Sequence, residues 1–472
     1  MDTGDLNNSK SILERAVFIG LLILLVWVPL PLASNRPWAW AIMEVWIFFL
    51  SILWCVAWLR GVAEFSPAFL KAKPVFILFV AWLGYLVIQS LPLPPLWVAF
   101  LSPERVLSHS LISSENIWLP LTQDSHTTWV YFLKSIAYVQ LFSLVLLLAN
   151  TSNRVRLLAY TIVYSALFQA VYGSIMILSG LEYGFFVKKE YGIGTATGTF
   201  VNRNHLAGYL EMALAVGIGL LIAGLRNGKS VCTTRQRLRN SIQLIFSSKF
   251  RLRIFLAFMV IALVLTHSRM GNTAFFTSLL VTGVITLLLT RHATRITALL
   301  LTSLIVIDLF IVGTWFGIDK VAERLEKTSI ATEVRVDVNE YAVDYLQDYL
   351  LTGSGAGTFF TVFSKYKGQD ASLYFDHAHN DYLEFADETG FLGIALLAGV
   401  IFLTALNAVQ ALRKRSDPLM LGIAFACVMG LISILIHSLV DFNLHIPANA
   451  ATFMVILAFG FIASTLNLRV EK

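Results

Sequence analysis

Long apolar runs alternate with short stretches of glycine, proline and charged residues along most of the chain. A helix rises about 1.5 Å per residue, so a run of roughly 17–25 apolar residues reaches across the hydrocarbon core of a bilayer. By this measure the chain has about twelve such runs, although one of them is short: Ala16–Ala33, Trp38–Leu59, Pro74–Leu91, Trp129–Ala149, Arg156–Leu181, His205–Leu225, Ile254–Thr266, Asn272–Thr290, Ile296–Phe316, Phe391–Leu412, Leu419–Val440 and Ile446–Leu468. The pattern predicts an all-α membrane protein with about 12 transmembrane helices.

One long polar segment, from Gly317 to Glu388, interrupts this pattern and carries more Asp and Glu than Lys and Arg. Loops of this length are usually functional. Within it Val334, Val338, Tyr341, Ala342, Tyr345 and Tyr349 recur at helical spacing, so Val334–Leu350 is expected to form an amphipathic helix on the bundle or membrane surface. A small folded cap without a chemical role is the alternative. The chain therefore divides into residues 1–316 with transmembrane helices 1–9, a large loop over 317–388, and residues 389–472 with helices 10–12.

The composition excludes a soluble globular protein. Hydrophobic residues make up 57% of the 472 residues, charged residues make up 14%, and the mean hydropathy is +0.73. The first apolar run lacks a clean small-x-small cleavage site, so we expect a retained helix rather than a signal peptide. The chain is predicted to be a multi-pass membrane protein.

Lysine and arginine predict the orientation in the membrane, because short cytoplasmic loops carry an excess of both residues. A cytoplasmic N-terminus places every strongly basic short loop on one side, including Arg226–Arg253, and places both termini inside. The large acidic loop then faces outward. The net charge of +6 mostly reflects the basic residues of the cytoplasmic loops. The basic loop lacks the interleaved aromatic residues of a nucleic-acid site.

Several common sites are missing from the sequence. The three cysteines, Cys55, Cys232 and Cys427, lie in predicted spans or in the basic loop, and no Cys/His spacing resembles a zinc site, so neither disulfide nor structural metal is expected. No P-loop or dinucleotide-binding motif is present. The run Gly353–Gly357 is interpreted as a tight turn after a helix rather than a phosphate cradle. We expect no cofactor, so the energy for any reaction must come with the substrate.

The stretch from His377 to Gly393 combines two imidazoles with a run of carboxylates directly before an apolar segment. Side chains that titrate near neutral pH are costly beside hydrocarbon, so their gathering at the mouth of a membrane helix indicates chemistry at the interface. This stretch is the predicted reactive end of the molecule.

Arginines supply candidate anion-binding groups near the same face. The run that precedes Arg269 has only about thirteen residues, too few to cross a bilayer, so Arg269 is expected to lie sunk below the interface and to hold phosphate. Pairing with an acid, or snorkelling to headgroups, is the alternative.

Arg203 lies where the chain enters the sixth run, beside Asn202, Asn204 and His205. The two asparagines are candidate helix caps, and Arg203 together with the helix N-terminus would face an anion. Arg335 and Lys134 are weaker candidates, equally consistent with ordinary surface or snorkelling cations.

The short hairpin His437–Ala450 is predicted to lie close to the top of the bundle. Asp441 or His445 would there contact a substrate or orient His379, with simple helix capping as the alternative. The acids Glu44, Glu211 and Asp308 fall within apolar runs and are expected to pair with other helices.

These motifs resemble the O-antigen ligase and polymerase superfamily. His379-Asn380 followed by Gly390, eleven positions after the histidine, resembles the hallmark of that family. The resemblance extends, in the family's order, over the segments Gly198–Ala207, Ser268–Gly271 and Arg335 with Gly353–Phe359. It covers roughly 194–393.

The resemblance implies a metal-independent glycosyltransferase of class C architecture in the bacterial inner membrane, with its active site on the periplasmic face. It implies an undecaprenyl-diphosphate-linked glycan as donor and a glycan or lipid A-core as acceptor. His379 would be the general base, Arg269, Arg203 and Arg335 would hold the diphosphate, and Asn202, Asn204, His205, Asn380, Gly390 and Asp441 would support them. An imidazole with an ordinary pKa of about 6.5 suits the role of base, and fixed guanidinium groups suit a departing diphosphate.

A flippase or transporter of lipid-linked glycans is the alternative function. It would show internal repeats and polar groups near the midplane, whereas the polar groups here concentrate at one face and no convincing repeat is found. Among transferases, a polymerase is favoured over a ligase, because the acidic loop would repel a phosphorylated lipid A-core.

Overall fold

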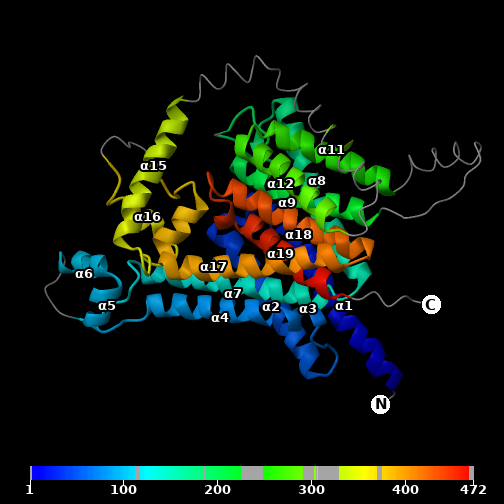
Figure 1. Cartoon of the computed structure of the whole chain (residues 1–472), viewed down its shortest axis with the longest axis horizontal. Coiled ribbons are helices and arrows are strands. Elements are labelled where there is room, and N and C mark those ends of the chain that lie inside the picture. Colours follow the sequence, from blue (N-terminus) through cyan, green and yellow to red (C-terminus); the bar gives the residue numbers. More distant parts are fainter. Residues whose placement is uncertain are drawn as a thin grey trace, which may run out of the picture.

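Long helices form the body of the protein in a computed structural model (Figure 1). The structure describes residues 3–111, 117–184, 186–190, 192–224, 248–290, 302–303, 306, 329–368 and 375–466. The longer helices are α1 (Thr3–Trp27), α2 (Pro37–Leu59), α4 (Lys73–Ser90), α7 (Ser125–Leu148), α8 (Ser152–Ser179), α9 (Arg203–Ala223), α11 (Ser248–Leu265), α12 (Arg269–Leu289), α15 (Ser329–Asp348), α17 (Asp381–Lys414), α18 (Pro418–His437) and α19 (Pro447–Thr465). Short elements are η1 (Leu32–Ser34), α3 (Pro67–Lys71), α5 (Pro95–Leu101), α6 (Pro103–Ser110), α16 (Phe359–Phe363) and η2 (Asn443–His445). Within the described residues the one sheet is an antiparallel pair, β1 (Tyr183–Gly184) and β2 (Val187–Lys188), with Tyr183 opposite Lys188.

Nine of the described helices are long and apolar enough to cross a membrane: α2, α4, α7, α8, α9, α12, α17, α18 and α19. The predicted multi-pass all-α architecture is therefore confirmed. Helices α1 and α11 match two further predicted runs. The predicted run Ile296–Phe316 lies almost wholly outside the described residues, and the count of about 12 spans stays a prediction.

Helices α18 and α19 lie between two groups of helices, with α8, α9, α11 and α12 on one side and α2, α4, α7 and α17 on the other (Figure 1). The backbones of α9 and α18 touch where Gly219 meets Gly422. A Cβ on Gly219 would lie 2.3 Å from the carbonyl oxygen of Gly422. Small residues allow this close approach, which is a common way to join helices inside a membrane.

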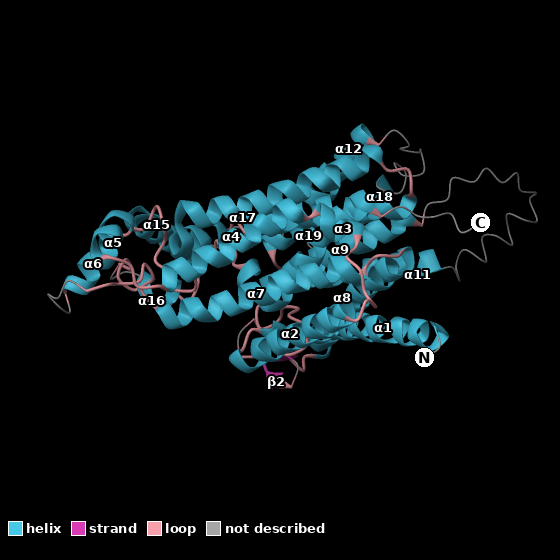
Figure 2. Cartoon of the chain, turned by 90° about the horizontal axis from the view of Figure 1, so that it is seen from below, coloured by secondary structure: helices cyan, strands magenta, loops and turns pink. Residues whose placement is uncertain are grey.

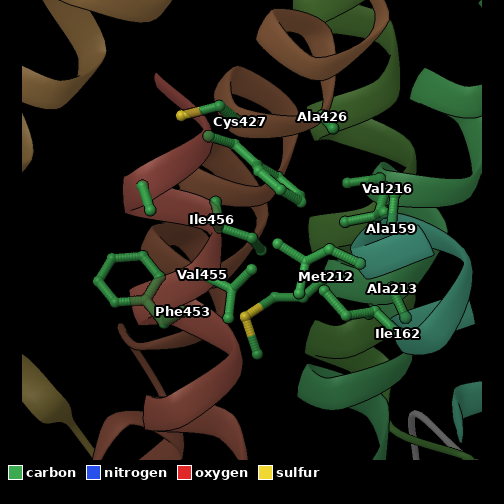
Figure 3. Packing of buried hydrophobic residues seen from close by; sticks show 14 of the residues in the cluster. Ala159, Ile162, Met212, Ala213, Val216, Ala426, Cys427, Phe453, Val455 and Ile456 are labelled. Atoms are coloured by element: carbon green, nitrogen blue, oxygen red, sulfur yellow. The ribbon is translucent and has the colours of Figure 1, made fainter. Parts of the chain in front are cut away.

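The core continues on both sides of α9. Met212 of α9 points toward Val455 and Ile456 of α19, while Ala159 and Ile162 of α8 lie on the other side of α9 (Figure 3). These side chains are at most 3% exposed. The packing fixes the end of α9 that carries Arg203 relative to the hairpin between α18 and α19.

Helices α5, α6, α15 and α16 gather beyond one end of the long helices, whereas α1 begins toward the other end (Figure 2). We call these four helices the end unit. Its core joins Val338, Ala342 and Tyr345 of α15 to Phe359 and Phe363 of α16. An amphipathic helix over most of the predicted range Val334–Leu350 is thus confirmed, since Val338, Ala342 and Tyr345 pack inward as their spacing indicated. Its predicted place on the bundle or membrane surface stays a prediction.

Helix α17 begins at Asp381, ten residues before the expected start at Phe391, so residues 381–389 of the hallmark motif are helical. The helix breaks at Gly390, whose φ of 62° and ψ of −172° are not helical. A Cβ there would lie 2.4 Å from the carbonyl oxygen of Leu351. Glycine is required at this position by both its conformation and its surroundings.

The glycine-rich segment Gly353–Gly357 packs against this break, as a turn and not as a phosphate cradle. Its amides donate hydrogen bonds to carbonyl oxygens of α17, from Ser354 N to Asp387 O at 3.0 Å and from Gly355 N to Glu388 O at 2.9 Å. In return Phe391 N donates to Leu350 O at 2.8 Å. The end unit is thereby joined to α17 through main-chain atoms.

Candidate functional site

His379 lies at the start of α17, in a backbone conformation that directs its ring toward the α18–α19 hairpin. Its φ is 53°, in the left-handed region that is costly for residues other than glycine. The next residue, Asn380, caps the helix, because its Oδ1 accepts hydrogen bonds from the amides of Tyr382 and Leu383 at 3.0 and 3.2 Å. The cap and the turn together hold the imidazole at the end of the bundle.

Asp441, fully buried in the hairpin, is surrounded by three imidazoles. His379 Nδ1 lies 3.5 Å from Asp441 Oδ1, and His205 Nε2 lies 3.8 Å from the same oxygen. His437 Nε2 lies 4.0 Å from Oδ2. Burial alone would raise the pKa of the Asp441 carboxyl, but the imidazoles, His205 foremost, hold that pKa well below its usual range. Asp441 is therefore an anion that faces His379.

Phe442 fills the space between the imidazoles. His377 stacks on its ring at 4.0 Å between centroids, whereas His205 and His379 meet it edge-on at 4.6 and 4.9 Å. These contacts fix the planes of the rings, so the imidazoles of His377 and His379 meet Phe442 in different orientations.

His377 belongs to a second cluster on the other side of Phe442, together with His445, Glu384 and Asp381. His377 Nδ1 lies 2.6 Å from Glu384 Oε1, and His445 Nδ1 lies 2.8 Å from Asp381 Oδ1. His445 Nε2 faces Glu384 Oε1 at 3.3 Å. Burial disfavours the charged rings, but Glu384 raises the pKa of His377, and Glu384 with Asp381 raises the pKa of His445 to about 9. This cluster is a structural ion network.

The acids of the motif lie on one face of α17. Asp381, Glu384, Asp387 and Glu388 follow one another at helical spacings, with Glu384 three residues after Asp381 and with Asp387 and Glu388 three and four residues after Glu384. Each side chain is at most 2% exposed. Glu388 Oε1 accepts from the amide of Phe359 at 3.1 Å, which links this face to the end unit. The face therefore connects the end unit to the hairpin.

The cluster around Asp441 extends into the bundle through His437. His437 Nδ1 lies 3.2 Å from Oε1 of Glu211, and both side chains are buried. The expected pairing of Glu211 with another helix is confirmed. Glu44 is different, because no cation of the described residues lies within 4.0 Å of it; Asp308 lies outside the described residues.

Arg269 and Arg203 occupy the first residues of α12 and α9, and both side chains are exposed. Arg269 is not buried within the protein, and its expected position below the membrane interface stays a prediction. Helix α11 begins at Ser248 and runs for 18 residues through the charged Arg251 and Arg253, so it is longer than its apolar part. Each arginine instead stands at a helix N-terminus, where the helix dipole favours anions.

The residues that follow these arginines reach the Asp441 cluster. His205, two residues after Arg203, contacts Asp441. Gly271, two residues after Arg269, packs against His437, since a Cβ there would lie 3.3 Å from the ring carbon Cε1. The structure thus brings the first turns of α9 and α12 to the cluster that holds His379.

The remaining predicted site residues have distinct places. Asn202 caps α9, with its Oδ1 accepting from the amide of Asn204 at 2.9 Å, whereas the Asn204 side chain makes no such cap. Arg335 lies on α15, and its side chain is outside the described part of the structure. Lys134 lies inside the bundle with its Nζ 3.6 Å from the ring centre of Trp40.

One set of side chains has the chemistry of a metal site. The ligand atoms of His377, Glu384 and His445 lie within 4.8 Å of one another, and two imidazoles with one carboxylate suit zinc. Direct contact between His377 and Glu384 at 2.6 Å is a hydrogen-bond distance, shorter than the separation of two atoms bound to one metal ion. The expectation of no metal stays a prediction.

Phe442, His437 and Glu384 were not singled out from the sequence. The regular spacing of the motif acids was a signal for Glu384, because one helix face collects them. Phe442 and His437 carried no comparable signal, since their roles arise from contacts between elements distant in the chain.

Comparison with known protein families gives one match. Residues 254–398 match the family model described as O-Antigen ligase. The predicted resemblance to the O-antigen ligase and polymerase superfamily is confirmed over these residues, which include Arg269, His379 and Gly390. A glycosyltransferase-like membrane enzyme of polysaccharide biosynthesis follows from the match. No curated protein matches the chain.

Proposed function

We propose that the protein transfers a glycan from an undecaprenyl-diphosphate donor to an acceptor hydroxyl at the periplasmic face of a bacterial inner membrane. The observation that carries this proposal is the position of His379, 3.5 Å from a buried carboxylate of Asp441 and at the mouth of a membrane helix. An imidazole oriented by a carboxylate is a common form of general base.

Asp441 favours the tautomer of His379 that carries the proton on Nδ1. The other ring nitrogen, Nε2, is then free to accept the proton of an acceptor hydroxyl, and 22% of the side chain is exposed to receive it. The acceptor oxygen forms a bond to the anomeric carbon of the donor sugar as the bond between that carbon and the diphosphate oxygen breaks. The electron pair of the broken bond leaves with the diphosphate.

Arg269 and Arg203 are the proposed partners of the departing diphosphate. A guanidinium fork bonds two phosphate oxygens at once, and a helix N-terminus adds amide donors. Both arginines lie on turns that contact the Asp441 cluster, which supports their placement near the reacting atoms. Arg335 of α15 is a third candidate. In this proposal the arginines neutralise the leaving group, so the transfer step itself uses no metal.

The proposal covers more than one acceptor. We favour a polymerase, which adds the glycan to another repeat unit, over a ligase acting on lipid A-core, because the loop over 317–388 is rich in acids. A protein acceptor is a third possibility for this class of enzyme.

Incubation of the purified protein with a synthetic repeat unit on undecaprenyl diphosphate tests the proposal. A ladder of products from this donor alone indicates a polymerase, whereas transfer only after addition of lipid A-core indicates a ligase. Absence of transfer with every acceptor, by protein that remains folded, would contradict glycan transfer.

A further inference from the structure

A cavity of about 200 Å³ lies within a ring of four helices, α4, α7, α17 and α19, where each helix contacts the next. We call it the four-helix cavity. Its wall is almost wholly apolar and includes Phe79, Trp82, Tyr138, Leu397, Phe453 and Leu457. The site around His379 makes no use of it.

The four-helix cavity follows the helices over a long distance. On α17 its lining residues lie on both sides of the break at Gly390, from Asp381 to Phe385 and from Ile394 to Ile401. On α7 the lining runs from Tyr131 to Val139, about 12 Å. A narrow apolar slot parallel to membrane helices fits a hydrocarbon chain better than a compact ligand.

One cation, Lys134, faces the cavity. Among the described residues no carboxylate oxygen lies within 4.0 Å of Lys134 Nζ, although Lys134 lines the wall. The other charged groups at the wall, Asp381 and His445, are bonded to each other at 2.8 Å. Lys134 is therefore the group of the wall that suits the phosphate of a lipid, with Glu44 and Glu388 acting on it from beyond 4.0 Å.

The cavity opens beside the candidate active site. Asp381 lines its end, lies two residues after His379, and donates its amide to the carbonyl oxygens of Ser438 and Asp441 at 3.0 and 3.2 Å. Arg203 and Arg269 stand on α9 and α12, on the far side of α18 and α19 from this cavity (Figure 1). The four-helix cavity and the two arginines thus lie on opposite sides of α18 and α19.

We infer that the four-helix cavity holds the hydrocarbon chain of a phosphate-bearing lipid that anchors the glycan acceptor. The inference rests on the proposed function, in which the arginine side holds the donor diphosphate. A lipid in the cavity brings the acceptor glycan to His379 from the opposite side. The acceptor is then a lipid-linked glycan and not a protein.

A tryptophan at Ala398 tests the acceptor role, because Ala398 lines the cavity yet is exposed, so the larger side chain fills the slot without entering a packed core. The control is Ala395→Trp, an exposed alanine of the same helix outside the lining. Transfer is measured with saturating donor and two acceptors, the repeat unit on a polyprenyl diphosphate and the same unit as a methyl glycoside.

We expect Ala398→Trp to raise the KM for the lipid-linked acceptor at least tenfold, to leave the KM for the methyl glycoside within about twofold, and to leave the donor KM unchanged. The Ala395→Trp protein should resemble the wild type. Equal effects on both acceptors, or no effect on either, overturn the acceptor role. A rise in the donor KM alone overturns it as well, because the cavity would then hold the donor chain.

Lipid binding is measured separately from transfer, with the photoreactive residue p-benzoylphenylalanine in place of Phe453, which lines the cavity. The control position is Phe402, which is 61% exposed on α17 and lies outside the lining. With tritiated polyprenyl diphosphate as the probe, labelling at Phe453 should saturate and be displaced by unlabelled lipid, whereas labelling at Phe402 should rise with bulk lipid.

The two measurements separate the proposals. Saturable labelling at Phe453 without any transfer supports the lipid site and contradicts the proposed function. Transfer without saturable labelling at Phe453 overturns the lipid site and leaves the proposed function in place. The role of the Lys134 charge is tested with Lys134→Gln, by comparing how well polyprenyl diphosphate and the uncharged polyprenyl alcohol displace the label at Phe453. The substitution should remove the preference for the diphosphate. An unchanged preference overturns the role of Lys134.

Discussion

His379 faces Asp441 across 3.5 Å, from Nδ1 to Oδ1, at the junction between the start of α17 and the α18–α19 hairpin. His377, two residues earlier, faces Glu384 instead. The two histidines of one motif therefore have different partners and different expected roles.

Replacement of His379 by alanine should abolish transfer while the protein stays folded and still binds donor. Loss of a positioned general base typically removes about 10²–10⁴-fold in rate. Replacement of His377 by alanine should retain substantial activity, because its ring serves the Glu384 network. Rates from the two purified variants, with donor binding measured alongside, check this. Robust transfer by His379→Ala protein would rule out the base, and equal losses would mean that the pair acts as one unit.

Asp441→Asn should lower kcat about tenfold to a hundredfold, because an uncharged amide no longer stabilises the positive charge that forms on the His379 ring. The asparagine keeps the shape of the side chain but no longer selects the tautomer of His379. Asp376→Asn is the matched control, since Asp376 is exposed in the same motif region. Unchanged kcat in the Asp441 variant, at normal KM, would mean that the carboxylate serves only the packing of the hairpin.

Arg269→Lys should lose about tenfold or more in kcat if the guanidinium binds the diphosphate, because an ammonium group cannot form the two parallel bonds of the fork. Arg203→Lys should behave likewise. Arg251→Lys, on the charged first turns of α11, is the control and should be near normal. The measurement is turnover at saturating acceptor. Near-normal turnover of Arg269→Lys would assign that arginine a structural role.

The ion network of His445 predicts a loss of stability in alkali. The pKa of His445 is raised to about 9, above its value of about 6.5 in an unfolded chain, so its stabilisation is complete below about pH 6.5 and disappears as pH rises through 9. The contribution is on the order of 3 kcal/mol. His377 acts in the same direction, whereas the lowered pKa of Asp441 gives stability that is lost only in acid.

The thermal midpoint of the protein in detergent should therefore fall between about pH 7 and 9.5, and a His445→Gln variant should show a smaller fall. If the variant and the wild type lose stability in parallel over this range, His445 does not carry the effect.

The orientation predicted from lysine and arginine places the motif region in the periplasm. The segment around Asp370 falls outside the described residues, so the exposed Asp376 is the better position for a single cysteine, in a protein whose native cysteines are replaced. A membrane-impermeant maleimide should label Asp376→Cys in intact spheroplasts and spare Ser416→Cys, which lies in a predicted cytoplasmic loop. The reverse pattern would move the site to the cytoplasm.

Periodicity in the sequence predicted the features that depend on a single helix, namely its position in the chain and its buried face. Val338, Ala342 and Tyr345 are buried as their spacing indicated, and most apolar runs became helices. The depth of Arg269 in the membrane stays a prediction, but the helix before it is longer than its apolar run, because α11 also includes Arg251 and Arg253. Polar residues extend helices beyond their apolar parts, so hydropathy alone misplaces a terminal side chain.

Contacts between distant elements could not be predicted in this way. Glu211 and His437 are separated by 226 residues and meet only because α9 packs on α18. Of the three rings around Phe442, two come from the loop before α17 and one comes from the first turn of α9. Only the fold brings such groups together, and the sequence carries no local signal for them.

The joint between the end unit and α17 is formed by main-chain atoms of Ser354, Gly355 and Phe391, with Gly390 at the break. Hydrogen bonds between amides and carbonyls do not depend on which side chains surround them. The outward faces of α15 and α16 are therefore free to diverge in evolution while the joint and the position of His379 persist.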